Sequence, residues 1–383
     1  MIEKIIEYCA RNRFVVITFY LIIIGWGVWT VMHTPLDAIP DLSENQVIVF
    51  TEWMGRAPQL VEDQVTFPLV SALQGVPGVQ TVRATSMFGM SFVYMIFNDG
   101  VDPYWARSRV LEKLTTVQSS LPPGAKTQIG PDGTGIGQVF WYTVEGKYDL
   151  GTLRAIQDWY VKLNLQSVEG VAEVASVGGY VKQYQVDVDP NKMKAYNVSM
   201  AEIRTAVMRS NNDVGGKIIE SNDAEYFVRG QGYIHTIGDI ENIVVATRTN
   251  GVPVYVKDIG VVQMGGDIRR GVLEKEGEAV GGIVMMRYGE NAKEVIDRVK
   301  EKIKEISAGL PPGVEIKTAY DRSDLIMRAV GNLEHALTEE AMVVALVILL
   351  FLLHFRSALR VVIEIPVAVL IAFIFMHLFG ITS

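Results

Sequence analysis

The chain has 383 residues, a formal net charge of −8, a mean hydropathy of +0.22 and 49% apolar residues. The acidic balance and the lack of a basic tract argue against a nucleic-acid-binding protein. The apolar content exceeds that of an ordinary soluble protein, yet it is too low for a chain that lies wholly within a membrane.

The first apolar run extends from Phe14 to Met32 without a charged residue. At about 1.5 Å per residue it is roughly 28 Å long, close to the hydrocarbon core of a bilayer. A signal peptide has an apolar stretch of about 7–15 residues and a small-residue cleavage site, and this run fits neither. We therefore predict a retained transmembrane helix over 14–33. Because Arg11 and Arg13 precede it and acidic residues follow, residues 1–13 are expected in the cytoplasm.

Prolines and aspartates follow this helix in the segment TPLDAIPDLS, residues 34–43. Its two prolines, Pro35 and Pro40, predict a rigid exit path, and Asp37 and Asp41 are expected to fix the turns beside them. Attraction of cations is the alternative role for these two carboxylates.

Two further apolar runs, Ala341–Leu353 and Ile365–Gly380, predict a second and a third transmembrane helix over 336–355 and 361–380. The segment HFRSALR between them carries Arg356 and Arg360, which is typical of a short cytoplasmic turn. The chain is expected to end before a fourth helix, and the residues between the first two helices are expected outside the cytoplasm. That external part has no cysteine, since the single one is Cys9, so it has neither disulfides nor cysteine-ligated metal.

Three residues in these last two helices have expected positions. Glu339 and Glu340 are predicted at the outer start of the second helix, where the helix dipole favours acidic side chains. An acidic entrance for cations is the alternative. Pro366 is predicted in the first turn of the third helix, where proline is tolerated.

Two pairs of similar segments indicate a duplicated unit in the external part. GVPGVQTVRATS (75–86) is similar to SVEGVAEVASVG (167–178), and LPPGAKTQI (121–129) is similar to LPPGVEIKT (310–318). Each segment follows a helix-like stretch, and its glycine or prolines turn the chain into a strand. The order predicts two copies of a β-α-β-β-α-β unit, the split βαβ pattern.

The wider spacing of the second pair indicates an insertion into the second copy, at about 181–275. The insertion is predicted to be rich in strands, with one helix at Met200–Ser210. The expected strands lie in KQYQVDVD, AEYFVRGQG, NIVVATR and VPVYVKDIGVVQMG.

Seven segments of the chain resemble the heavy-metal efflux pumps of the resistance-nodulation-division superfamily, the CusA/CzcA group. They are TPLDAIPDLS (34–43), DPYWARSRVLE (102–112), GPDGTGIG (130–137), VAEVASVGGYVKQYQVDVDP (171–190), NGVPVYVKDIG (250–260), RRGV (269–272) and GVEIKTAYDRSDLI (313–326). The resemblance implies a membrane α-helical plus periplasmic α+β fold with two ferredoxin-like porter subdomains. The first is expected over 40–133, the second over 134–180 and 276–325, and a β-rich docking subdomain over 181–275.

The resemblance also implies partners and a location. A multi-pass homotrimer in the bacterial inner (plasma) membrane, in contact with membrane lipid, is expected to work with a periplasmic adaptor, which is a membrane fusion protein, and an outer-membrane channel. It would export metal cations against proton influx. The metal is then the substrate, and neither enzymatic activity nor a cofactor is expected.

The segments DPYWARSRV and GPDGTGIG resemble the Cu(I)/Ag(I) exporters of this group more than the divalent Co/Zn/Cd exporters, which remain the alternative. The resemblance implies that Cu(I) exporters have a methionine two residues before the RRG element, whereas the two residues before Arg269 in this chain are Asp267 and Ile268. Family pumps are also much longer, with their proton relay beyond the third helix. The chain is therefore expected to be a fragment of a pump, or else a non-pumping membrane-anchored interaction module if the short chain is the true product.

Methionines supply the candidate metal ligands. A thioether is a soft ligand that suits Cu(I) or Ag(I) and needs no deprotonation. The segment SMFGMSFVYM places Met87 and Met90 on either side of a Phe88–Gly89 turn, where a regular hairpin would make them face each other. Flexible packing in the core is the alternative for this pair. Met264, upstream of the RRG element, is the third candidate ligand.

Other chemistry is not indicated. GPDGTGIG is rich in glycine, but it lacks the Lys-Ser/Thr of a P-loop and precedes a predicted strand, so we do not expect nucleotide binding. No cluster of His, Asp or Glu has zinc-site spacing, and no nucleophile elbow or catalytic dyad is recognisable.

Overall fold

The structure is a computed structural model, and it describes residues 11–33, 39, 43–221, 224–248, 251–269, 271–352 and 355–379. Two compact units make up the chain: Met1–Val144 with Tyr160–Ser176 and Gly281–Ser383, and Glu145–Trp159 with Val177–Val280. Most of the segment TPLDAIPDLS lies outside the described residues, including Asp37 and Asp41, so their expected roles stay predictions.

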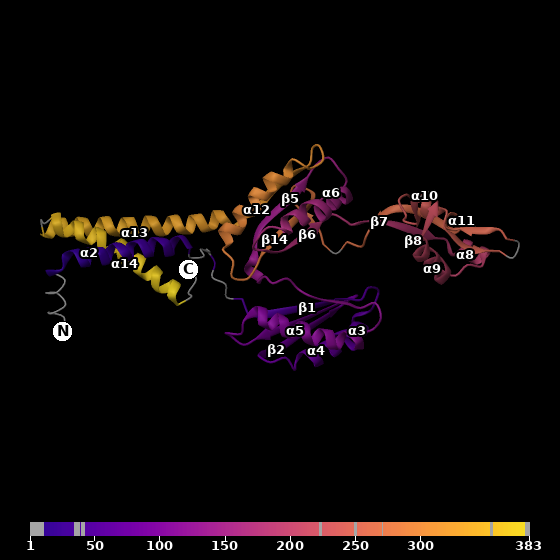
Figure 1. Cartoon of the computed structure of the whole chain (residues 1–383), viewed down its shortest axis with the longest axis horizontal. Coiled ribbons are helices and arrows are strands. Elements are labelled where there is room, and N and C mark those ends of the chain that lie inside the picture. Colours follow the sequence, from indigo (N-terminus) through magenta and orange to yellow (C-terminus); the bar gives the residue numbers. More distant parts are fainter. Residues whose placement is uncertain are drawn as a thin grey trace. The chain divides into compact units, whose positions relative to one another are not determined.

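The first unit contains a four-stranded antiparallel sheet in the order β2-β3-β1-β4. Its strands are β1 (Gln46–Glu52), β2 (Val79–Met87), β3 (Met90–Phe97) and β4 (Lys126–Ile129). The connecting helices are α3 (Pro58–Val61), α4 (Phe67–Leu73) and α5 (Pro103–Val117). Figure 1 labels two strands of this sheet, β1 and β2, together with the helices α3, α4 and α5. Helix α5 begins where the sequence dictates, because Asp102 caps it by accepting from the backbone N–H of Trp105 and Pro103 follows.

Alternation along β1 and β3 decides which face of this sheet is buried. Val47, Val49, Val93 and Met95 point into a core shared with the helices, and each is at most 1% exposed. The residues that alternate with these four along each strand lie on the opposite face of the sheet. Phe50 and Phe92 are on that face, and their rings stack with the centroids 6.5 Å apart. The observed order of strands and helices is the predicted β-α-β-β-α-β order.

A second sheet joins segments that are far apart in the sequence. Strand β14 (Glu278–Met286) pairs with β6 (Val171–Gly178) and with β5 (Gln138–Glu145), which in turn neighbours β15 (Glu315–Asp321). The helical stretches are α6 (Leu150–Ile156) and α7 (Lys162–Gln166), joined by a π-helical turn, and α12 (Ala292–Ser307). Strand β13 (Leu273–Glu274) also pairs with β14. The strand order is the one found in the first sheet.

The described residues between β6 and β14 form three two-stranded sheets. They pair β7 (Lys182–Val188) with β12 (Gly260–Gly266), β8 (Val214–Ser221) with β9 (Ala224–Gly230), and β10 (Val244–Thr247) with β11 (Pro253–Tyr255). The predicted helix Met200–Ser210 is α9 and begins with a capping box at Ser199 and Glu202. Strand β8 was not anticipated from the sequence.

Two expectations for this segment are wrong. Three short helices accompany α9: α8 (Pro190–Tyr196), α10 (Ile237–Glu241) and α11 (Val256–Ile259). Helix α11 also divides VPVYVKDIGVVQMG, which was expected to be one strand. The Asp258 side chain accepts from the backbone N–H of Tyr255, 2.8 Å away, which starts a helical turn and buries Val256 and Ile259 together.

The described residues also contain the long helices α2 (Arg13–His33), α13 (Arg322–Leu352) and α14 (Phe355–Leu378). Within the described residues one stretch, Arg13–Val31, is long and apolar enough to cross a membrane, and Ile363–Leu378 is a shorter apolar stretch. Helices α2 and α14 pack closely, since a Cβ added to Gly27 would lie 2.7 Å from the Cβ of Leu370. Near their ends Trp29 meets His377 edge-on, with the ring centroids 5.7 Å apart.

Helix α13 begins at Arg322, directly after β15, and not near residue 336. No proline and a single glycine, Gly331, lie between these positions, so nothing in the sequence stops the helix there. Glu339 and Glu340 consequently lie inside the helix, and their predicted place at a helix start is wrong.

Helix α14 corrects two further expectations. It begins at Phe355, so the segment HFRSALR is helical from there on and is not a turn. Pro366 lies inside the helix and not in its first turn. The apolar run continues on both sides of the proline, which allows the helix to persist around the missing backbone donor.

Candidate functional site

The predicted methionine pair lies at the tip of the hairpin between β2 and β3. Met87 ends β2, Met90 begins β3, and the two are direct partners across the Phe88–Gly89 turn. Directly opposite residues of an antiparallel pair share a face, with their Cβ atoms about 5 Å apart. The expected face-to-face arrangement of these two side chains is therefore present.

A third methionine, Met54, lies at the same tip. The loop after β1 is tied to the turn by two backbone hydrogen bonds: Trp53 N–H donates to Gly89 O at 2.8 Å, and Gly89 N–H donates to Arg56 O at 2.9 Å. Gly89 has φ +69°, and a Cβ built on it would lie 3.2 Å from Met54 Cα and 3.4 Å from Met54 Sδ. No local sequence signal predicts this contact, because it depends on how β1 pairs with β3.

Core packing does not account for the three side chains at this tip. Met87 is 51% exposed and Met54 is 53% exposed. Met90 is partly exposed and lies on the face opposite the core, in phase with Phe92 and not with the buried Val93. The methionine of this hairpin that does fill the core is Met95, which is fully buried.

The other candidate ligand, Met264, belongs to the second compact unit. It lies on β12 opposite Tyr184 of β7 and is 48% exposed. It lines an open cavity of about 480 Å³ together with Asp149, Tyr180, Lys182, Gly265, Gly266, Asp267 and Arg269. Met264 is the single sulfur among these lining residues, and two cationic side chains share the cavity with it.

Asp149 is the carboxylate in this cavity with the most partners. It caps α6 by accepting from the Thr152 N–H at 3.0 Å, and it also accepts from the Thr152 hydroxyl and from Lys182 Nζ at 3.2 Å. The hydrogen bond from the Thr152 hydroxyl is the largest of the effects that hold the pKa of Asp149 far below its usual value. The carboxylate is thus ionised and already engaged by Lys182, which leaves little negative charge for a cation.

The glycine-rich segment GPDGTGIG has a structural explanation. A Cβ on Gly133 or on Gly137 would lie 2.9 Å from the carbonyl oxygen of Met286, so the loop passes too close to β14 for any side chain. Asp132 in this loop forms an ion pair with Arg287 at 3.5 Å and accepts from the Tyr104 hydroxyl at 3.4 Å. Burial, followed by the charge of Asp132, raises the pKa of Tyr104, which keeps its hydroxyl protonated.

The same loop lines a cavity of about 460 Å³ in the first unit. Four of the lining side chains are acidic and one is a guanidinium, and they are Glu44, Asp99, Asp102, Asp132 and Arg107. Arg107 donates to Pro131 O at 3.1 Å, and Asp102 caps α5, so two of these charges have structural roles. In the described part of the chain no group of three or more His, Cys, Asp or Glu side chains is arranged to hold a metal ion.

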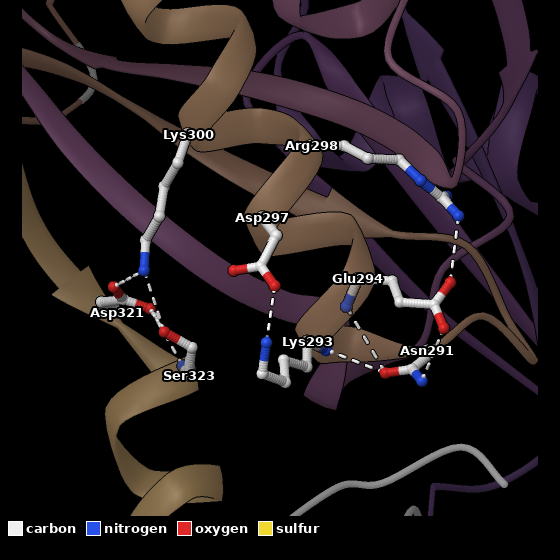
Figure 2. Close-up of polar contacts among 8 residues, drawn as sticks. All are labelled: Asn291, Lys293, Glu294, Asp297, Arg298, Lys300, Asp321 and Ser323. Atoms are coloured by element: carbon white, nitrogen blue, oxygen red, sulfur yellow. Dashed lines mark hydrogen bonds and ion pairs between the residues drawn. The ribbon is translucent and has the colours of Figure 1, made fainter. Parts of the chain in front are cut away.

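A polar network joins α12 to the start of α13. Lys300 forms an ion pair with Asp321, the last residue of β15, and donates to the Ser323 hydroxyl at 2.9 Å (Figure 2). The backbone N–H of Ser323 donates to Asp321 at 2.9 Å. Between them Arg322, 2% exposed, donates to Ile136 O at 2.6 Å. The first turn of α13 is thereby fixed to α12 and to the loop before β5.

A profile of the AcrB/AcrD/AcrF family matches residues 5–383. The cation efflux system protein CusA of Escherichia coli (strain K12) is 51% identical over 388 residues, covering 100% of this chain and 37% of its own length. The putative cation efflux system protein SilA of Salmonella typhimurium has the same identity and coverage. The cobalt-zinc-cadmium resistance protein CzcA of Cupriavidus metallidurans is 34% identical, covering 97% of this chain and 36% of its own length.

Solved structures give a matching result. A crystal structure of a heavy metal efflux pump superposes with a TM-score of 0.90 at 34% identity, covering 99% of this chain and 38% of that chain. The chain therefore spans little more than a third of the length of the proteins it matches.

Proposed function

From the premise that this chain belongs to the AcrB/AcrD/AcrF family, we propose that it is the N-terminal part of a proton-driven heavy-metal cation efflux pump. The observation that carries the proposal is the 51% identity over the whole chain to relatives named as cation efflux proteins. The heavy-metal pump structure, with a TM-score of 0.90, supports it.

The proposed cargo is Cu(I) or Ag(I). The relative named for cobalt, zinc and cadmium is 34% identical to the chain, well below the 51% of the CusA and SilA proteins. The exposed methionines of the β2–β3 tip also suit soft monovalent cations, whereas no acidic or histidine cluster in the described residues suits divalent ones. A divalent exporter remains the rival proposal, since the chain has no methionine directly before Arg269.

In the proposed layout, α2, α13 and α14 cross the inner membrane and the two sheets with their helices form two periplasmic porter subdomains. The β7–β12 segment would be the docking subdomain. Helix α13 supports this layout, because it runs without a break from β15 into its apolar half. The network of Lys300, Asp321 and Ser323 would then transmit movement between the membrane and the second porter subdomain.

The proposed partners are two further copies of the chain, a periplasmic adaptor and an outer-membrane channel. The β8–β9 hairpin supports self-association, because its apolar side chains are exposed on both faces. They are Val214, Ile218, Ile219, Tyr226, Phe227 and Val228. A two-stranded ribbon of this kind is marginally stable in water alone and gains from burial against another chain.

Metal tolerance tests the proposed function. The complete pump that carries these residues, expressed in a host lacking its own exporters, is expected to restore growth in Ag(I) and copper. Protection against Zn(II) alone would overturn the monovalent assignment, and no protection against any metal would overturn efflux.

The same assay tests Met264. Its replacement in Met264→Ile keeps the side chain apolar and similar in volume but removes the sulfur, so tolerance falls if the thioether lies on the cation's route. Unchanged tolerance would remove Met264 from that route.

A further inference from the structure

We propose that Met54, Met87 and Met90 form a three-thioether binding site for a soft monovalent cation, hereafter the tip site. It lies at one end of the first sheet, where the β2–β3 turn meets the loop after β1. This inference rests on the proposed function in one respect, which is that the transported ion is Cu(I) or Ag(I). The contacts that assemble the tip site stand independently of it.

The backbone holds the three residues in one place. Met87 and Met90 are fixed opposite each other by the strand register. Met54 is fixed by the two hydrogen bonds that join Trp53 and Arg56 to Gly89. Because Gly89 has no side chain, the Met54 sulfur can lie against the turn that separates the other two methionines.

The side chains can reach a common point. A methionine side chain has three rotatable bonds, so three sulfurs whose backbones lie around one two-residue turn can converge on a single ion. Met54 and Met87 are about half exposed, so an ion can enter from solvent without opening the core. A purely structural role would instead bury these apolar side chains, as it buries Met95 in the same hairpin.

The chemistry selects the ion. Thioethers favour Cu(I) and Ag(I), while Zn(II) favours nitrogen, thiolate or carboxylate ligands. One carboxylate lies nearby, because Glu52 of β1 is the partner of Met90 on its other side, and it favours a cation over a neutral ligand. The guanidinium of Arg56 lies 4.9 Å from the centre of the Trp53 ring. Trp53 is buried on the core-facing side of the sheet, the side opposite Met90, so this contact draws the positive charge of Arg56 away from the tip site.

Titration of the full 383-residue chain with Ag(I) tests the tip site, using the methyl NMR signals of ¹³C-labelled methionine. We expect the signals of Met54, Met87 and Met90 to shift together and to saturate at one ion, with no shift on adding Zn(II). Met87→Leu keeps the volume of an exposed side chain and should weaken Ag(I) binding by about tenfold or more.

A matched control is Met208→Leu, since Met208 on α9 is 66% exposed and should leave Ag(I) binding at the tip unchanged. The tip site is overturned if Met87→Leu binds Ag(I) as the unaltered chain does. It is also overturned if the exposed Met208 signal shifts at the same Ag(I) concentrations as those of the tip. Metal tolerance measures efflux separately. If the unaltered chain binds no Ag(I) at the tip while the complete pump still exports Ag(I), the tip site is rejected and the proposed function stands.

Discussion

Gly178 lies where β6 ends, and its backbone leaves no room for a side chain. Its φ is +79°, and a Cβ there would overlap the carbonyl oxygen of Ala279 and lie 2.7 Å from the Cβ of Leu273. Gly178→Ala is therefore expected to lower the free energy of unfolding by about 3 kcal/mol, combining left-handed strain with a steric clash. Denaturant unfolding of the chain in detergent, followed by Trp fluorescence, measures the loss.

Gly313 provides the control that separates these two effects. Its φ is also +79°, but a Cβ there would meet nothing within 4 Å. Gly313→Ala should therefore cost only the strain, about 1 kcal/mol. Equal losses in the two variants would contradict the steric argument for Gly178.

The candidate methionine ligands differ in how much of their arrangement could be predicted from the sequence. The facing of Met87 and Met90 could be predicted, because a two-residue turn fixes the register of a hairpin by local chemistry. The third member, Met54, could not, since it reaches the tip only through the pairing of β1 with β3. Met264 was predicted from its position in the sequence alone, and its cationic neighbours Lys182 and Arg269 depend on tertiary structure.

The junction of β15 and α13 is the element whose electrostatics can be tested directly. Burial raises the pKa of Asp321, but hydrogen bonds from Lys300 and Ser323 outweigh burial and hold the pKa below its ordinary value. A carboxyl group with a lowered folded-state pKa stabilises the fold fully above its unfolded pKa. That stabilisation is lost as the pH falls through the folded-state pKa.

We therefore expect Asp321→Asn to be less stable than the unaltered chain by about 1 kcal/mol at pH 7, near the upper end for a partly exposed ion pair. The difference should begin to shrink below about pH 4, where the unfolded chain takes up the proton, and it should vanish as the pH falls through the lower folded-state pKa. Denaturant unfolding at several pH values measures both effects.

Asp297→Asn on α12 is the matched control, because its pair with Lys293 lies at 2.6 Å but is more exposed, and its loss should stay below about 0.5 kcal/mol. A pH-independent difference between Asp321→Asn and the unaltered chain would refute the assignment of the pKa shift to this junction.

Elements with clear local signals were predicted well. Helix α12 (Ala292–Ser307) is the helix-like stretch predicted before the second LPPG segment, and it forms there because Asn291 caps it and LPPG ends it. The errors arose where local signals conflict with context. The segment VKDI looks like a strand from its β-branched residues, yet the Asp258 cap and the burial of Val256 and Ile259 make it a helical turn. The predicted start of helix α13, near residue 336, is later than the observed start at Arg322. The first half of the helix is polar, so the apolar pattern alone does not show that it continues into the apolar half.

At the scale of the whole molecule, the duplicated β-α-β-β-α-β order could be read from two repeated segment pairs, and both sheets have the corresponding strand order. Sequence order suffices here because connections between strands are short, unknotted and right-handed where a helix crosses over, which leaves few arrangements. Metal specificity is harder to read, because candidate ligands that are apart in the sequence, such as Met54 and Met87, come together only in the tertiary structure.

Membrane topology can be tested on the full chain, because it contains one cysteine, Cys9. If residues 1–13 are cytoplasmic, a membrane-impermeant maleimide added to cells with a permeabilised outer membrane should leave Cys9 unlabelled. In the Cys9→Ser background, Ser119→Cys should be labelled, since Ser119 is exposed just after α5 in the proposed periplasmic part. In lysed cells the maleimide should label both cysteines, which controls for their reactivity.

Labelling of Cys9 in unlysed cells, or of Ser119→Cys only after lysis, would contradict the proposed orientation. That orientation follows from the positive-inside rule applied to Arg11 and Arg13.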